Sequence, residues 1–107
     1  MRFGANTFIW RSPFSTKSDL DLIDKVKAFG FDFIEIAVES TALIELNSLK
    51  SSLQHKGMKA IMGGVYGPDR NLSSLAAKKR ANAVDYLKWM INAAAMLNAD
   101  LVNGPMY

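Results

Sequence analysis

Two patterns of hydrophobic residues alternate along this chain. Apolar runs with β-branched and aromatic residues occupy 2–10, 31–38 and 58–63, and a fourth run begins at residue 99. Runs of this length and composition are typical of buried strands. Between them, apolar residues recur every three to four positions, which is the period of a helix. The pattern therefore predicts the order β-α-β-α-β-α-β.

Three amphipathic helices are expected between the strands. Ser18 would cap the first helix and Asn47 the second, and the longest helix is predicted over 76–97. The first helix has an apolar stripe at Leu22, Val26 and Phe29. The longest helix has one at Ala83, Leu87, Met90, Ile91, Ala94 and Leu97. These stripes would pack against the sheet.

Gly30, Gly57 and Asn98 each stand where a helix ends and a strand begins. Glycine and asparagine tolerate the left-handed backbone conformation that ends many helices. Three left-handed helix ends are therefore expected.

Repeated strand–helix units build either a TIM barrel or a doubly wound sheet. A dinucleotide-binding sheet carries a glycine-rich fingerprint after its first strand, and residues 11–16 contain no glycine. Residues 63–67 contain three glycines but lack the lysine and hydroxyl of a P-loop. A TIM barrel takes about 250 residues. We therefore predict that residues 1–107 form a single partial domain, the N-terminal half of a TIM (β/α)8 barrel with about three and a half βα units.

Composition and charge exclude several other classes. The net charge of +3 comes from scattered basic residues, which disfavours a nucleic-acid partner. The chain contains no cysteine and opens directly into a predicted strand without a signal peptide. No apolar run is long enough to span a bilayer. We expect a cytoplasmic protein with no membrane partner.

Active-site groups of a barrel gather where its strands end. This rule selects as candidate pocket residues Asn6, Phe8, Trp10, Phe14, Glu35, Gly63, Gly64, Asn71, Gly104, Pro105 and Tyr107. Because Asn6, Phe8 and Trp10 alternate along a predicted strand, they would point to one side of it. Aromatic faces combined with an amide suit a sugar. Packing in the barrel core is the alternative for the two aromatic residues.

Glu35 lies inside an apolar strand, where an unpaired carboxylate would be costly to bury. It would either bind substrate hydroxyls and orient another group, or pair with a buried cation elsewhere in the barrel. Catalytic metals need three or four His or carboxylate ligands on one face, and only Glu35 is well placed. The sole histidine, His55, lies near the end of a helix, so no nucleophile–base arrangement forms. We expect neither metal ligands nor catalytic residues in this chain.

Four strand-end segments, at 3–10, 30–36, 67–74 and 104–107, occur in a characteristic order and spacing. Together they resemble the N-terminal part of the D-tagatose 3-epimerase / D-allulose (psicose) 3-epimerase family of xylose-isomerase-like enzymes. The resemblance implies a TIM barrel that binds Mn²⁺ or Mg²⁺, in some members Co²⁺, through two Glu, an Asp and a His on later strands. In that family the two glutamates exchange the C3 proton of a ketose through an enediolate.

By the same resemblance, the matching part builds the substrate pocket. Asn6, Trp10 and Phe14 would flank the sugar, and Glu35 would support the pocket. Four residues would keep backbone close to the sugar: Gly63, Gly64, Gly104 and Pro105. Tyr107 would begin the last loop. Family members often have tyrosine or phenylalanine where this chain has Asn6, so the resemblance leaves the sugar open.

The chain ends on a predicted strand, as a part of a larger architecture would, and we expect it to be inactive alone. The alternative is a non-catalytic half-barrel that binds a small polyol and self-associates to protect its sheet edges. We accordingly expect a homo-oligomer. The endonuclease branch of the same superfamily is a third hypothesis, which the mild charge disfavours.

Overall fold

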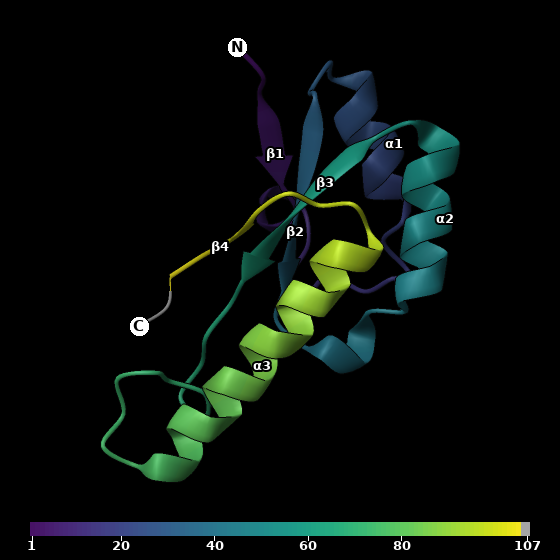
Figure 1. Cartoon of the computed structure of the whole chain (residues 1–107). Coiled ribbons are helices and arrows are strands. Elements are labelled where there is room, and N and C mark those ends of the chain that lie inside the picture. Colours follow the sequence, from purple (N-terminus) through teal and green to yellow (C-terminus); the bar gives the residue numbers. More distant parts are fainter. Residues whose placement is uncertain (106–107) are drawn as a thin grey trace.

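The computed structural model describes residues 1–105 and contains a four-stranded sheet in the order β1-β2-β3-β4 (Figure 1). The elements are β1 (Gly4–Asn6), η1 (Thr7–Ile9), α1 (Asp21–Ala28), β2 (Phe33–Val38), η2 (Thr41–Leu43), α2 (Leu46–Lys56), β3 (Lys59–Gly64), α3 (Ala77–Met96) and β4 (Val102–Asn103). The predicted order β-α-β-α-β-α-β is confirmed.

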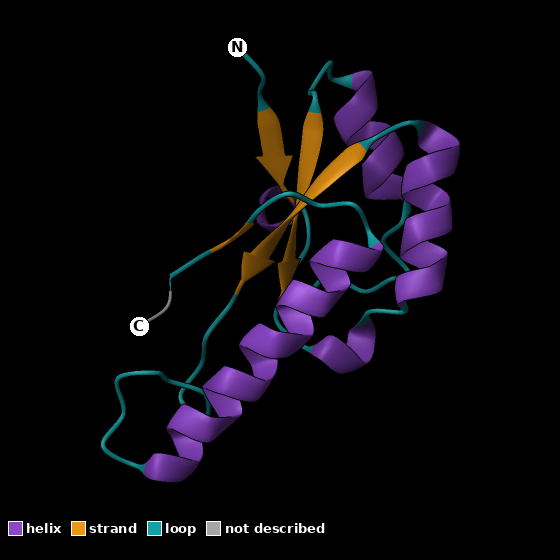
Figure 2. Ribbon diagram, in the orientation of Figure 1, coloured by secondary structure: helices purple, strands orange, loops and turns teal. Residues whose placement is uncertain are grey.

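The strands are arranged as in a barrel wall. Each strand pairs with the next one in the sequence, and all three pairings are parallel. A doubly wound sheet would instead reverse its order at a switch point. The helices α1, α2 and α3 lie along one face of the sheet (Figure 2). The sheet therefore has a covered face and, opposite it, the face that lines the interior of a barrel, called here the inner face.

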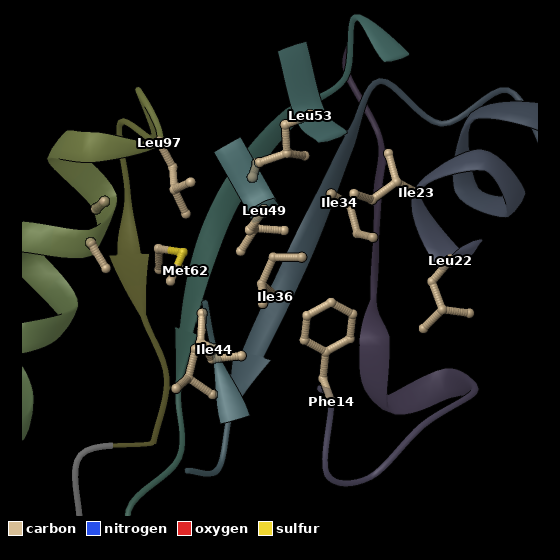
Figure 3. Packing of buried hydrophobic residues seen from close by; sticks show 14 of the residues in the cluster. Phe14, Leu22, Ile23, Ile34, Ile36, Ile44, Leu49, Leu53, Met62 and Leu97 are labelled. Atoms are coloured by element: carbon tan, nitrogen blue, oxygen red, sulfur yellow. The ribbon is translucent and has the colours of Figure 1, made fainter. Parts of the chain in front are cut away.

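The core fills the layer between sheet and helices. Ile34, Ile36 and Val38 alternate along β2 and are fully buried. They belong to a cluster whose helical members include Leu22, Ile23, Val26, Leu49, Leu53 and Met90, and Figure 3 shows part of this packing. Because side chains alternate along a strand, Phe33 and Glu35 lie on the inner face.

The three predicted left-handed helix ends are confirmed. The φ angles of Gly30, Gly57 and Asn98 are 84°, 62° and 53°. This conformation allows the chain to turn directly from each helix toward the next strand.

The first strand is much shorter than the predicted 2–10, because side chains at its end replace ladder hydrogen bonds. Asn6 Oδ1 accepts a hydrogen bond from Phe8 N at 2.8 Å and caps the turn η1. Thr7 Oγ1 accepts from Ala37 N at 3.0 Å. Beyond Asn6 the chain is therefore not extended, and the prediction that Asn6, Phe8 and Trp10 alternate along one strand is wrong.

The predicted caps are also wrong. The first helix begins at Asp21, and Ser18 does not cap it. Glu45, rather than Asn47, caps α2 by accepting from Asn47 N at 3.2 Å and Ser48 N at 2.7 Å. Hydrogen bonding from the Ser48 side chain, and then from the backbone N–H of Ser48, lowers the pKa of Glu45 below 4.5.

Two positions of the predicted apolar stripes do not face the sheet. Phe29 is 64% exposed at the end of α1, and Ile91 is 54% exposed on α3. On α3 the predicted Ala83, Met90 and Ala94 are buried, and Tyr86 and Ala93 are buried in addition. The buried side of α3 therefore keeps most of the predicted stripe and extends it toward Tyr86 and Ala93, while Ile91 lies outside it.

Candidate functional site

Three polar side chains from three different strands lie on the inner face of the sheet. The strand register pairs Asn6 of β1 with Glu35 of β2, and Gly63 of β3 with Asn103 of β4. Neighbouring partners in a parallel ladder point to the same face. Asn6 and Asn103 are the last residues of their strands, which places this polar cluster toward the carboxyl ends.

Glu35 reaches across the neighbouring strand because residue 63 is glycine. A Cβ atom at Gly63 would lie 2.9 Å from Glu35 Oε1, so the carboxylate occupies the space that a side chain would need. In the amide orientation that satisfies both of its polar atoms, Asn103 donates to Glu35 Oε1 at 2.9 Å and to Met62 O at 3.2 Å. Within residues 1–105, the partner of Glu35 is thus an amide and not a cation.

A second pair of glycines brings the backbones of β3 and β4 together. Gly104 has a φ of 134°, and a Cβ atom there would lie 2.2 Å from the Gly64 carbonyl oxygen. Gly64 is itself buried, and its own Cβ would meet the Asn103 carbonyl oxygen at 3.2 Å and the Tyr66 ring at 3.3 Å. This close approach positions Asn103 beside Gly63.

Tyr86 and Arg70 brace the carboxyl ends of β2 and β3. The Tyr86 hydroxyl donates to Val38 O and accepts from Val65 N at 2.9 Å. Arg70 Nη2 donates to Glu39 O at 2.6 Å and to Val65 O at 2.7 Å. The Arg70 guanidinium carbon lies 3.9 Å from the centroid of the Tyr86 ring. The two side chains therefore bind both strand ends at once.

The sequence reasoning missed this brace. Tyr86 lies four residues before Met90 on the same helical face, so its spacing could have indicated a core position. No local signal marks the partners of its hydroxyl, because they lie 21 and 48 residues away.

The aromatic candidates after β1 are dispersed. Phe8 is 46% exposed. Trp10 stacks on Phe29, which directly follows α1, with ring centroids 6.2 Å apart, and Lys25 Nζ lies 5.3 Å from the Trp10 ring. Phe14 is buried in the core beside the helices (Figure 3). The structure thus brings neither Trp10 nor Phe14 to the polar cluster.

The remaining candidates lie in loops. Asn71 Oδ1 accepts from Ser73 N and Ser73 Oγ, both at 2.8 Å, and so shapes the turn before α3. Pro105 is exposed after β4. Tyr107 lies outside the described residues.

Residues 1–105 do not provide a metal centre, because no three of their His, Asp and Glu side chains gather closely enough to hold an ion. The polar cluster contains a single carboxylate, which is too few ligands for a catalytic metal. None of the helices in this part of the chain is long and apolar enough to cross a membrane.

Solved structures of sugar epimerases share this fold. The D-allulose 3-epimerase from Methylomonas sp. superposes with a TM-score of 0.89 at 21% identity, over 100% of this chain and 40% of its own. The D-psicose 3-epimerase from Clostridium cellulolyticum H10 gives 0.83 at 26% identity, over 100% and 38%. An L-ribulose 3-epimerase gives 0.84 at 23% identity, over 98% and 35%. The chain therefore spans about 40% of the length of the first of these structures.

A comparison with curated proteins gave no significant match. A family model described as xylose isomerase-like TIM barrel matches residues 23–107, which is most of the chain. The parallel sheet in sequential order and the helices along one of its faces agree with that match. The chain belongs to the xylose isomerase-like TIM barrel family, and its fold is that of part of a ketose 3-epimerase-like barrel.

Proposed function

We propose that this chain is the substrate-pocket portion of a metal-dependent ketose 3-epimerase. The observation that carries the proposal is the Glu35 carboxylate, held over Gly63 by the Asn103 amide on the inner face. Carboxylates and amides are the groups that recognise sugar hydroxyls. Structures of similar fold include a D-allulose 3-epimerase in complex with D-allulose and a D-psicose 3-epimerase with D-tagatose. A neutral ketose is therefore the substrate that we infer.

Each member of the polar cluster has a proposed role. Glu35 Oε1 accepts from Asn103, and the second carboxylate oxygen would accept from a substrate hydroxyl. The Oδ1 atom of Asn6 is engaged by the backbone, which leaves its amide nitrogen as a donor to the sugar. Phe8 is the exposed aromatic residue that we place beside the sugar. Trp10 and Phe14 do not contact the sugar in this proposal and would support the segment that carries Phe8 from the helix side of the sheet.

The metal ligands and the proton-transferring groups would come from residues outside this chain, because residues 1–105 lack a ligand set. We therefore expect the 107-residue chain alone to show no epimerase activity. Chromatography of D-fructose incubated with the purified chain and Mn²⁺ checks this. Formation of the C3 epimer above the level of a protein-free control would contradict it.

The decisive experiment is to read the source gene beyond the codon for Tyr107. The proposal expects an open frame of about 150 further residues with Glu, Asp, His and Glu at later strand ends. The full product should then epimerise a ketose at C3 in the presence of Mn²⁺ or Mg²⁺. A stop codon at this point, or a full product without such activity, would overturn the proposal.

Gly63→Ala tests the role of Glu35 in the full product. The new Cβ would displace Glu35 Oε1 from a point 2.9 Å away and so separate it from Asn103. Because the displaced atom is the end of a flexible side chain, the thermal midpoint should change little. We expect the KM for the ketose to rise about tenfold, the loss of one hydrogen bond to a charged group.

Gly67→Ala is the matched control, because nothing lies within 4 Å of a Cβ atom at Gly67. Its KM should equal that of the unmodified protein. An unchanged KM in Gly63→Ala would refute the assigned role of Glu35.

A second candidate is a half-barrel that binds a polyol without catalysis and completes itself as a homo-oligomer. The specific observation is that β1 and β4 each have one neighbour in the sheet. Near these strands, Phe3 is 60% exposed and Leu101 is 49% exposed. Light scattering distinguishes the two functions, because only this one requires a stable symmetric assembly of the 107-residue chain.

A further inference from the structure

A cleft of about 600 Å³ lies apart from the polar cluster, and neither Glu35 nor Asn103 lines it. It is formed by the loops that follow β2 and β3 together with part of α3. The cleft is on the helix side of the sheet, because its wall includes Tyr86, whose hydroxyl is bonded to Val38 beneath α3. Its volume falls in the usual range for small-molecule sites, roughly 300–1,000 Å³.

One wall of the cleft holds a fixed donor. Arg70 is committed through Nε and Nη2 to the backbone carbonyls of Val65 and Glu39, and its guanidinium stacks on Tyr86. Its Nη1 group makes no hydrogen bond to another described residue and remains available to a ligand. Because the guanidinium is already held in place, a ligand that accepts from Nη1 need not order this side chain.

The lining of the cleft also includes carboxylate acceptors and an indole ring. Asp85 and Trp89 lie four residues apart on α3 and therefore share one face of the helix. Asp69 and Glu39 line the loops, and Glu39 Oε1 accepts from Ser12 Oγ at 2.5 Å. The lining thus combines three carboxylates with one guanidinium and has a net negative charge.

We propose that this cleft is a second binding site, for a neutral sugar. A sugar ring would lie against Trp89, with hydroxyls donating to Asp85 and accepting from Arg70. The excess of carboxylates disfavours a sugar phosphate, whose charge they would repel. The carboxylates would attract a simple amine, but a protonated amine has no acceptor for Arg70 Nη1 and no ring to lie against Trp89. The inference does not rest on the proposed epimerase function, because no residue of the inner face takes part.

The test is an NMR titration of the ¹⁵N-labelled chain with D-fructose, D-fructose 6-phosphate and putrescine in parallel. We expect D-fructose to shift the indole N–H signal of Trp89 and the Nε–H signal of Arg70. Asp85→Asn should weaken this binding about tenfold, as expected for loss of a charged hydrogen-bond acceptor. Trp89→Phe, which retains an apolar ring, should weaken it independently. Glu35→Gln is the control and should leave it unchanged.

Several results would overturn the proposal. They are the absence of any sugar-induced shift at Trp89, a preference for the phosphate or for putrescine, and binding that Glu35→Gln abolishes while Asp85→Asn does not. The last result would place the sugar on the inner face, as the proposed function requires, and so separates the two hypotheses.

Discussion

Replacement of Gly104 by alanine is expected to detach β4 from β3. The φ of 134° at this position is one that residues with a side chain rarely adopt, and the new Cβ would lie 2.2 Å from the Gly64 carbonyl oxygen and 2.9 Å from Gly64 N. Both contacts are with backbone, which cannot turn aside as a side chain does. The strain should cost about 2–4 kcal/mol locally. The attachment of β4 to β3 is short, because the ladder pairs only Val102 and Asn103 and the Leu101 carbonyl adds one hydrogen bond from Met62 N.

Hydrogen exchange measures this effect directly. The Met62 amide donates to Leu101 O at 3.0 Å and should be protected only while β4 is docked. We expect its exchange in Gly104→Ala to accelerate by about thirtyfold or more, the equivalent of about 2 kcal/mol. The loss of β4 would also remove Asn103 from Glu35, so a local change in the backbone would disrupt the polar cluster.

Gly67→Ala again serves as the control, because Gly67 has open space around its Cβ position and no positive φ. Its Met62 amide should exchange at the original rate. Native protection of Met62 in Gly104→Ala would show that the close approach to Gly64 does not govern β4.

The second large effect is expected from Tyr86→Phe. The hydroxyl of Tyr86 is the hydrogen-bond partner of two backbone groups, Val38 O and Val65 N. Phenylalanine keeps the ring but leaves both groups without this partner, at a cost of about 1–3 kcal/mol in the free energy of unfolding. Urea denaturation followed by circular dichroism should show a lower midpoint with an unchanged slope.

The pH dependence of this loss has a definite sign. Burial raises the pKa of Tyr86 above 10.0. A raised folded-state pKa contributes stability that is complete below the unfolded pKa and is lost as the pH rises through the folded pKa. The difference between the two proteins should therefore be constant at neutral pH and shrink in alkali.

Tyr66→Phe provides a matched comparison within the same aromatic pair, whose ring centroids are 5.2 Å apart. The Tyr66 hydroxyl is buried without a hydrogen-bond partner among residues 1–105. Its removal relieves an unsatisfied polar group and should leave stability unchanged or raised. An equal decrease in the free energy of unfolding of Tyr86→Phe and Tyr66→Phe would contradict the bracing role of the Tyr86 hydroxyl.

Local features of the sequence were sufficient for the order of the elements. Gly30, Gly57 and Asn98 were correctly predicted as left-handed helix ends, because that conformation depends on the residue itself. The longest helix, predicted over 76–97, is observed at Ala77–Met96. Strands that alternate with helices left a barrel or a doubly wound sheet, and the absence of glycine from residues 11–16 favoured the barrel.

Contacts between distant residues decided what local patterns could not. The run 2–10 has the composition of a long strand, yet it leaves the ladder after Asn6 because Thr7 bonds to Ala37, thirty residues away. Asn47 has the better capping side chain by preference, but the backbone turn before α2 places Glu45 at the cap. The hydrogen bonds of such side chains depend on which backbone groups the fold brings near them, so the sequence alone does not predict them.

In the candidate site, too, the sequence predicts some features and the tertiary contacts decide others. By itself, the sequence determined that Glu35 is a carboxylate within a buried strand and that Gly63 stands at the end of the next one. Only the strand register placed them on one face with Asn103. The Glu35 carboxylate therefore occupies the space that a side chain at residue 63 would need. A single-residue shift in that register would point Glu35 into the core, because side chains alternate between the two faces of a sheet.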